Sequence, residues 1–191
     1  MELQTVIIDC KSCDEDERSA LVKKLSEKGI AVNYEYTKIT DARGVLLVTD
    51  DREKASEAVL DGTALVTYMV SYKGTQCILE GLDEVDADFL NKMYERHCGI
   101  PWTIAETERL LIREFTTKDK VDIFPDISVD PEFTEKYIEK MYGFFGYGIW
   151  ALISKQNSSI IGRAGVYNRE GYDGLEIGYE IDDPYKGRGL A

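Results

Sequence analysis

The hydrophobic and polar positions of the first hundred residues follow two periodicities in turn. Short apolar runs rich in β-branched residues lie at residues 5–9, 44–49 and 63–70, as in the buried strands of a parallel sheet. The segments 14–28 and 51–60 instead place apolar residues at helical spacing. Strands that alternate with helices predict a small parallel α/β domain of the Rossmann-like kind.

Weaker patterns complete this first region. Residues 31–36 alternate as a strand does, residues 76–79 offer a further short strand, and residues 87–97 carry an apolar helix face. Gly29 and Gly62 follow the first two helices, at the positions where a cap is expected. The region therefore contains enough elements for a small sheet with its covering helices.

A domain boundary is predicted near Pro101. The segment 99–102 has the sequence Gly-Ile-Pro-Trp, which combines two helix breakers with a large aromatic residue. This composition suits a linker that packs against one of the domains it joins. We expect an α/β domain of unassigned role over residues 1–99 and a second domain over residues 100–191.

The second region changes from parallel to antiparallel signals. Residues 109–115 form a predicted strand, and two helices are expected after it, over 117–123 and over 131–142 with Asp130 as N-cap. Polar turns then separate the remaining strands and favour antiparallel hairpins. These strands are expected over 146–154, 159–167 and 175–181.

A glycine-punctuated turn, residues 186–191, follows the last predicted strand. Backbone N–H groups that point outward from such a turn can bind phosphate oxygens. By itself, the spacing of Gly187 and Gly189 is more typical of an ordinary surface turn. The rest of the region therefore decides how the turn is interpreted.

Several segments of this region resemble motifs of the GNAT N-acetyltransferases, in the branch that acetylates ribosomal-protein N-termini. The segments follow one another in the same order as in that family. Residues 107–115, Thr-Glu-Arg-Leu-Leu-Ile-Arg-Glu-Phe, with Asp119 after them, resemble the opening strand of that family. Residues 162–165, Gly-Arg-Ala-Gly, and 176–179, Glu-Ile-Gly-Tyr, are similar to its third and fourth strands. The resemblance extends from about Trp102 onward and implies a mixed-sheet GNAT domain.

The closing turn resembles the acetyl-CoA motif of the same family, Gln/Arg-x-x-Gly-x-Gly/Ala, with Lys186, Gly189 and Ala191 at the specified positions. The resemblance implies acetyl-CoA as co-substrate and no metal. Strand amides would bind the pantetheine arm and polarise the thioester carbonyl, while the turn would wrap the diphosphate. The cofactor-binding residues so implied are Tyr179, Glu180, Ile181, Lys186, Gly187, Arg188, Gly189, Leu190 and Ala191.

Acetyl transfer to an amine also requires a group that removes a proton, because an ammonium has no lone pair. Glu176 is the first candidate and Glu180 the second, and strict alternation would put both on one face of the strand unless a bulge separates them. The alternative is that these glutamates are solvated or ion-paired. Arg163 could bind a substrate carboxylate or pair across the sheet.

An aromatic cluster comes before these strands, formed by Tyr142, Phe144, Phe145, Tyr147 and Trp150. Such a cluster is most often core, although in the family that the chain resembles this region often walls the acceptor cleft. The resemblance to N-acetyltransferases implies that the acceptor is an amine, either a protein N-terminus or a small molecule.

The family continues past the acetyl-CoA motif with further helices and strands, so the chain resembles an incomplete member. We expect weak or no acetyl transfer from this chain alone, and an unpaired strand edge through which copies self-associate. The alternative is a non-catalytic two-domain binding or sensor protein that retains a remnant GNAT fold. Acetyl-CoA binding is the property that separates the two.

Charge and hydrophobicity restrict the partners. The chain has 23 basic and 36 acidic residues and a net charge of −13, which disfavours nucleic acid and anionic membranes and suits a cationic amine. No apolar run approaches the length of about 18 residues that a membrane span needs. The start lacks the features of a signal peptide, so a cytoplasmic location is expected.

Two features of the first region suggest chemistry of their own. Cys10 and Cys13 have the spacing of a redox pair, but four acidic residues follow at once and disfavour a thiolate, and a second pair for zinc is missing. Asp9 and Asp50–Asp51 follow predicted parallel strands, where sites of open α/β sheets lie. We expect neither feature to be catalytic and assign this domain to scaffolding or acceptor recognition.

Overall fold

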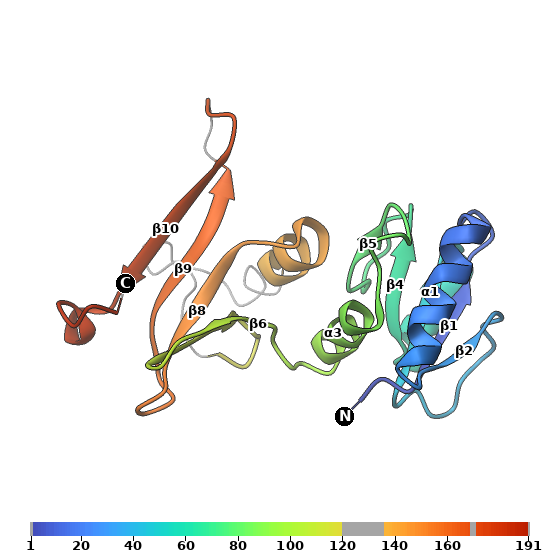
Figure 1. Ribbon diagram of the computed structural model, residues 1–191, viewed down its shortest axis with the longest axis horizontal. Coiled ribbons are helices and arrows are strands. Elements are labelled where there is room, and N and C mark those ends of the chain that lie inside the picture. Colours follow the sequence, from blue (N-terminus) through green and yellow to red (C-terminus); the bar gives the residue numbers. More distant parts are fainter. Residues whose placement is uncertain (1, 120–135, 169–170, 191) are drawn as a thin grey trace. The chain divides into compact units, whose positions relative to one another are not determined.

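The computed structural model describes residues 2–119, 136–168 and 171–190. The chain divides into two compact units, Met1–Ile100 and Pro101–Ala191. Each unit has its own sheet (Figure 1). The two units are described separately here, because each has its own core.

A five-stranded parallel sheet forms the centre of the N-terminal unit, in the order β2-β1-β3-β4-β5. The predicted parallel α/β arrangement is confirmed. The strands are β1 (Thr5–Asp9), β2 (Ala31–Asn33), β3 (Val45–Thr49), β4 (Ala64–Tyr68) and β5 (Ile78–Leu79), and the helices are α1 (Glu15–Glu27), α2 (Arg52–Asp61) and α3 (Ala87–His97).

Aspartates begin all three helices of this unit. Asp14, Asp51 and Asp86 each accept backbone N–H groups of the first helical turn, which would otherwise be unsatisfied. Gly62, with φ 73°, ends α2 in the left-handed conformation. Gly29 has φ 74° and directly follows Lys28, the last residue of the α1 cap. Local sequence therefore sets where these helices begin and end.

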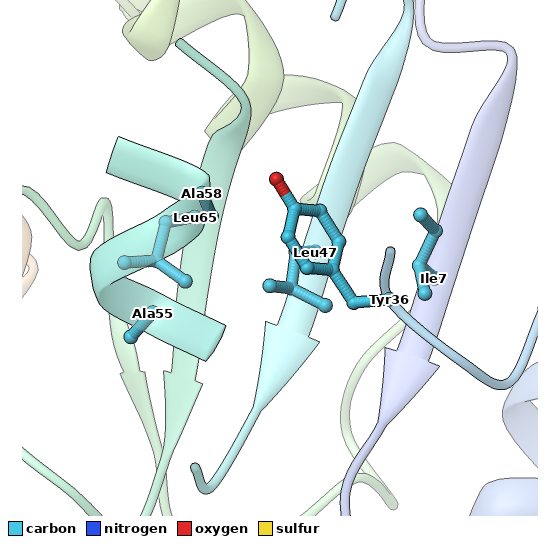
Figure 2. Close-up of a cluster of buried hydrophobic side chains, with 6 residues drawn as sticks. All are labelled: Ile7, Tyr36, Leu47, Ala55, Ala58 and Leu65. Carbon is cyan, nitrogen blue, oxygen red and sulfur yellow. The ribbon is translucent and has the colours of Figure 1, made fainter. Parts of the chain in front are cut away.

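Strand β2 is shorter than the predicted segment 31–36. The chain turns inward after Asn33, and the Tyr36 side chain enters the core, with only 4% of its surface exposed. The Tyr36 N–H donates to Asp9 Oδ2 over 2.7 Å, so a side chain takes the place of a sheet partner. Figure 2 shows the cluster that results, formed by Ile7, Tyr36, Leu47, Ala55, Ala58 and Leu65.

The C-terminal unit contains an antiparallel five-stranded sheet in the order β10-β9-β8-β7-β6. The predicted hairpins are confirmed by the pairing of β8 with β9 and of β9 with β10. The strands are β6 (Thr103–Glu106), β7 (Leu110–Glu114), β8 (Ile149–Ser154), β9 (Ile160–Asn168) and β10 (Leu175–Ile181).

Strand β6 was not predicted, because its residues look like part of a linker. All four are exposed, so its sequence carries no pattern of alternating burial. The strand exists through its pairing with β7, and Thr107 N–H closes the turn by donating to the Leu110 carbonyl over 2.8 Å. A strand that depends on a partner is not visible in local periodicity.

The helix predicted over residues 131–142 is confirmed where the structure describes it, but its type differs: residues 136–137 are α-helical and a π-helix, η1, follows over Ile138–Phe145. Residues 131–135 with the predicted N-cap Asp130, and residues 120–123 of the other predicted helix, lie outside the described residues. Residues 117–118 form a turn. Hydrogen bonding from i to i+5 brings residues five apart to the same side of the helix. Tyr137 and Tyr142 accordingly stack edge to face, with ring centroids 6.0 Å apart.

Both tyrosines hold the start of β8. The Tyr137 hydroxyl accepts the Ile149 N–H over 2.9 Å, and the Tyr142 hydroxyl donates to the Ile149 carbonyl. Tyr142 is almost fully buried and also accepts the Phe115 N–H over 3.3 Å. The N–H and the carbonyl of Ile149 are thus both satisfied by tyrosine hydroxyls, one from Tyr137 and one from Tyr142.

One end of the sheet is left open among the described residues. Strand β10 pairs only with β9, and its Leu175, Ile177 and Tyr179 side chains are 51%, 79% and 67% exposed. Nearer the end of the strand, Ile181 is buried with Leu110, Leu152 and Ile161. The apolar face of β10 is therefore covered only where the chain turns back after Ile181.

Candidate active site

The closing segment folds against the end of β10. A short 3-10 helix, η2 (Asp183–Tyr185), follows the strand, and a turn then runs to Leu190. Gly187 and Gly189 have φ values of 73° and 65°, a region in which other residues are strained. The predicted glycine-dependent turn is therefore present in the structure, anchored by Tyr185 and Leu190 against the core.

A hollow of about 390 Å³ lies where β10 meets this turn. Its volume is within the range usual for small-molecule sites. Most of the residues implied for cofactor binding line it together, with Tyr185 in addition: Tyr179, Glu180, Ile181, Lys186, Gly187, Gly189 and Leu190. Arg188 is not one of its lining residues, and Ala191 lies outside the described residues.

Tyr185 was not identified from the sequence. Its ring packs on the core cluster beneath the turn, and its hydroxyl accepts a hydrogen bond from Asn157 Nδ2 over 3.1 Å. The Arg188 guanidinium lies over the same ring, 5.4 Å from its centroid. An aromatic residue beside Pro184, directly before the turn, was the signal that could have identified it.

The turn presents its backbone donors. Within the described residues, the N–H groups of Gly187, Arg188, Gly189 and Leu190 donate no hydrogen bond. The carbonyls of Arg188 and Gly189 instead accept from the Arg109 guanidinium. The turn thus has uncommitted N–H groups beside the hollow, the arrangement that favours anions.

The two basic side chains of the turn make contacts within the protein. Lys186 Nζ forms an ion pair with Asp183, and this hydrogen bond raises the pKa of Lys186 and lowers that of Asp183. Arg188 donates to the Pro184 carbonyl over 2.7 Å. Both cations are thus engaged within the closing segment, although Lys186 also lines the hollow.

Strand β10 also offers backbone groups at its open edge. Asp182 N–H donates to the Ile161 carbonyl, and hydrogen-bonded pairs alternate along antiparallel strands. Glu180 therefore directs its backbone toward β9, whereas Tyr179 and Ile181 direct theirs outward. Of the three residues implied for the pantetheine arm, two present a free N–H and carbonyl at the edge.

Glu176 and Glu180 lie on one face of β10. The pairing of β10 with β9 continues without a register shift, so no bulge separates them. Glu180 forms an ion pair with Arg163, directly opposite on β9, which confirms the expectation that Arg163 pairs across the sheet. Glu176 is half-buried opposite Tyr167. Their roles in catalysis stay predictions.

Beside this ion pair, a second hollow of about 200 Å³ is bounded by two glycines that face each other. Gly165 and Gly178 are paired across β9 and β10, and both line this hollow. A Cβ on Gly178 would lie 3.0 Å from the Tyr167 ring, so this ring covers the glycine. Tyr179 and Glu180 line both hollows, and the two cavities therefore adjoin along β10.

The aromatic cluster divides into two parts. Tyr142 belongs to the core, as described above, whereas Phe145 is 41% exposed and its ring lies 5.9 Å from that of Tyr147. Trp150 is half-buried, and the Phe144 side chain lies outside the described residues. Core packing thus accounts for the most buried member and leaves Phe145 and Tyr147 at the surface.

The candidate residues of the N-terminal unit have structural partners. Asp9 accepts from Tyr36 and forms an ion pair with Lys54, and Asp50 accepts from the backbone and hydroxyl of Ser12 over 2.7 and 2.6 Å. Burial, together with a hydrogen bond and charge from Cys13, raises the pKa of the Cys10 thiol to about 12. A thiolate at Cys10 is thus disfavoured, as expected, although burial, Cys13 and Asp50 are the cause and not the acidic residues that follow Cys13.

Two searches bear on other classes of function. In the part of the chain that the structure describes, no group of three or more His, Cys, Asp or Glu side chains could hold a metal ion. Among the same residues, none of the helices has both the length and the apolar character needed to cross a membrane.

A comparison with known protein families concerns the C-terminal unit. Residues 100–191 match the family model described as the acetyltransferase (GNAT) domain. The C-terminal unit is thus similar to GNAT acetyltransferase domains, a class that generally uses acetyl-CoA as acetyl donor.

One solved structure is similar over part of the chain. It is a protein from Bordetella pertussis assigned to the GnaT acetyltransferase family, with 18% sequence identity and a TM-score of 0.35. The similarity covers 47% of this chain and 66% of that protein. The chain therefore spans just under two thirds of the length of this relative.

Proposed function

We propose that this protein is an acetyl-CoA-dependent N-acetyltransferase, of the branch that acetylates protein N-termini, and that the hollow between β10 and the closing turn holds the cofactor. The observation that carries the proposal is the meeting of outward strand groups at Tyr179 and Ile181 with uncommitted N–H groups of the turn. An acyl thioester attached to a diphosphate requires both kinds of donor.

The reaction that these residues support is a direct transfer. The acceptor amine loses a proton to a carboxylate, its nitrogen bonds to the thioester carbonyl carbon, and the C–S bond breaks to release the CoA thiolate, which takes up a proton. An N–H group of β10 would stabilise the oxyanion. Glu176, half-buried on β10, is the first candidate base, and Glu180, which forms an ion pair with Arg163, is the second.

The net charge of −13 supports an amine as acceptor, since a cationic substrate is attracted to an acidic protein. The adjoining hollow beside Glu180 supplies a place for it near the thioester. The acceptor class would be identified by screening peptide N-termini and small amines for release of free CoA thiol. Loss of turnover with unchanged acetyl-CoA binding in Glu176→Gln would support its role as base.

Calorimetric titration with acetyl-CoA tests the cofactor site. Gly189→Leu should abolish binding, because a leucine at φ 65° is strained and would disturb the conformation of the turn. Gly171→Leu is the matched control: this glycine has φ 83°, lies outside the hollow and has no atom near its missing Cβ. Unchanged affinity in Gly189→Leu would show that the turn is an ordinary loop.

The same titration bears on the remaining alternative, a non-catalytic binding or sensor protein with a GNAT fold. Release of thiol to an amine supports the enzyme. Binding of acetyl-CoA without such release is expected both of the sensor and of a weakly active enzyme. The absence of binding by the unaltered chain would remove the enzyme proposal.

A further inference from the structure

Arg109 connects the closing turn to a distant part of the sheet. It lies in the turn between β6 and β7, and its Nη1 donates to the Arg188 carbonyl over 2.8 Å while its Nη2 donates to the Gly189 carbonyl. The two carbonyls belong to consecutive residues. The planar guanidinium thus holds two adjacent peptide groups at once, which matches the fork geometry of arginine.

Peptide geometry gives this contact a consequence on the other side of the turn. In a trans peptide the carbonyl and the N–H of the next residue point in opposite directions, and the described chain has no cis peptide. Carbonyls of Arg188 and Gly189 that face Arg109 therefore direct the N–H groups of Gly189 and Leu190 away from it. Gly189 and Leu190 line the hollow, and Arg109 does not.

Arg109 is itself held in place. Its N–H donates to the Thr107 hydroxyl over 3.3 Å, and its carbonyl accepts from the Lys155 N–H over 3.0 Å. The contact with the turn is not required by burial, because Arg109, Arg188 and Gly189 are all exposed and water could satisfy their groups. Since solvation alone does not explain these hydrogen bonds, we infer that Arg109 controls the orientation of the turn.

We propose that Arg109 is a positioning residue that turns the Gly189 and Leu190 N–H groups toward the diphosphate of acetyl-CoA. This inference rests on the proposed function and deepens it. Lys186 and Arg188 make contacts within the closing segment, which increases the contribution expected from oriented main-chain dipoles. Arg109 acts from behind the turn and does not touch the ligand.

Two ligands separate positioning from general structural support. Acetyl-CoA carries the diphosphate, whereas S-acetyl-pantetheine has the same thioester arm without it. We expect Arg109→Gln to weaken acetyl-CoA binding by about tenfold in calorimetry, the loss of one or two hydrogen bonds. Binding of S-acetyl-pantetheine, followed by ligand-observed NMR, should not change. Arg109→Lys keeps the charge but not the fork and should be intermediate.

Lys155→Gln is the matched control, because it removes one positive charge near Arg109 from a residue whose ammonium contacts Thr107 and Glu106 instead of the turn. It should bind both ligands as the unaltered chain does. Equal loss of both ligands in Arg109→Gln, or no loss of acetyl-CoA, would overturn the positioning role alone. If the unaltered chain binds neither ligand, the proposed function fails with it.

Discussion

At the scale of single residues, Asp119 is a hydrogen-bond acceptor shared by two neighbouring residues of the C-terminal unit. Arg113 donates to both of its carboxylate oxygens over 2.7 Å, and Thr116 adds its N–H over 2.8 Å. Burial alone would raise the pKa of Asp119, but the hydrogen bonds from Arg113 and Thr116 outweigh it and lower that pKa. The Arg113–Asp119 ion pair connects the end of β7 to the turn that follows it. Both residues belong to the motif that resembles the family's opening strand.

Asp119→Asn should therefore reduce the free energy of unfolding by about 1–2 kcal/mol at neutral pH, as expected when one partner of a half-buried, hydrogen-bonded ion pair is removed. Because the folded-state pKa is depressed, this stabilisation is present above the ordinary carboxyl pKa and is lost as the pH falls through the lower folded value. Urea unfolding of variant and parent should converge below about pH 4. The exposed Asp173→Asn is the control, and a difference that persists in acid would contradict the assignment.

At the scale of elements, the glycines of β9 allow its neighbours to approach closely. A Cβ on Gly165 would lie 2.3 Å from the Gly148 carbonyl oxygen and 2.6 Å from the Ile149 Cα, both backbone atoms. A Cβ on Gly162 would lie 2.2 Å from the Glu180 carbonyl oxygen. The Gly-Arg-Ala-Gly segment that resembles the family is thus explained by contacts between strands.

Gly165→Ala should destabilise the C-terminal unit by about 2 kcal/mol, because backbone of β8 would have to move. Gly178→Ala is paired with it across the sheet, yet its Cβ would meet only the Tyr167 ring, which can rotate away. Thermal unfolding followed by circular dichroism should show a clearly larger decrease for Gly165→Ala. Equal effects of the two substitutions would contradict the backbone explanation.

At the scale of the whole molecule, the charge opposes the proposed cofactor. A net charge of −13 repels an anion such as acetyl-CoA at long range, and the proposed site attracts it only through main-chain dipoles at short range. Salt screens the long-range field much more than contacts at the site. The salt dependence of binding therefore reports which of the two is decisive.

We expect acetyl-CoA to bind more tightly as ionic strength rises from low to physiological values, as measured by the dissociation constant in calorimetric titrations. S-acetyl-pantetheine is uncharged and should bind with little dependence on salt. Steady weakening of acetyl-CoA binding with added salt would indicate that lysine or arginine side chains bind the diphosphate, contrary to the main-chain site.

Much of the candidate site could be predicted from sequence because its elements are local. Strand β10 occupies residues 175–181 as predicted, and the glycine turn follows it as expected. The contributions of Arg109 and Tyr185 could not be predicted, since they arise from contacts with residues remote in sequence or from packing beneath the turn. The engagement of Lys186 and Arg188 within the turn likewise required the coordinates.

The amino-acid sequence by itself determined the parallel α/β arrangement of the first unit, its helix caps and the order of hairpins in the second, because these follow from periodicity, aspartate caps and glycine turns. Tertiary structure alone decided that β6 is a strand, that Tyr137 and Tyr142 share Ile149, and that Arg109 orients the closing turn. Those features depend on atoms brought together from distant segments, and local patterns of polarity carry no record of such contacts.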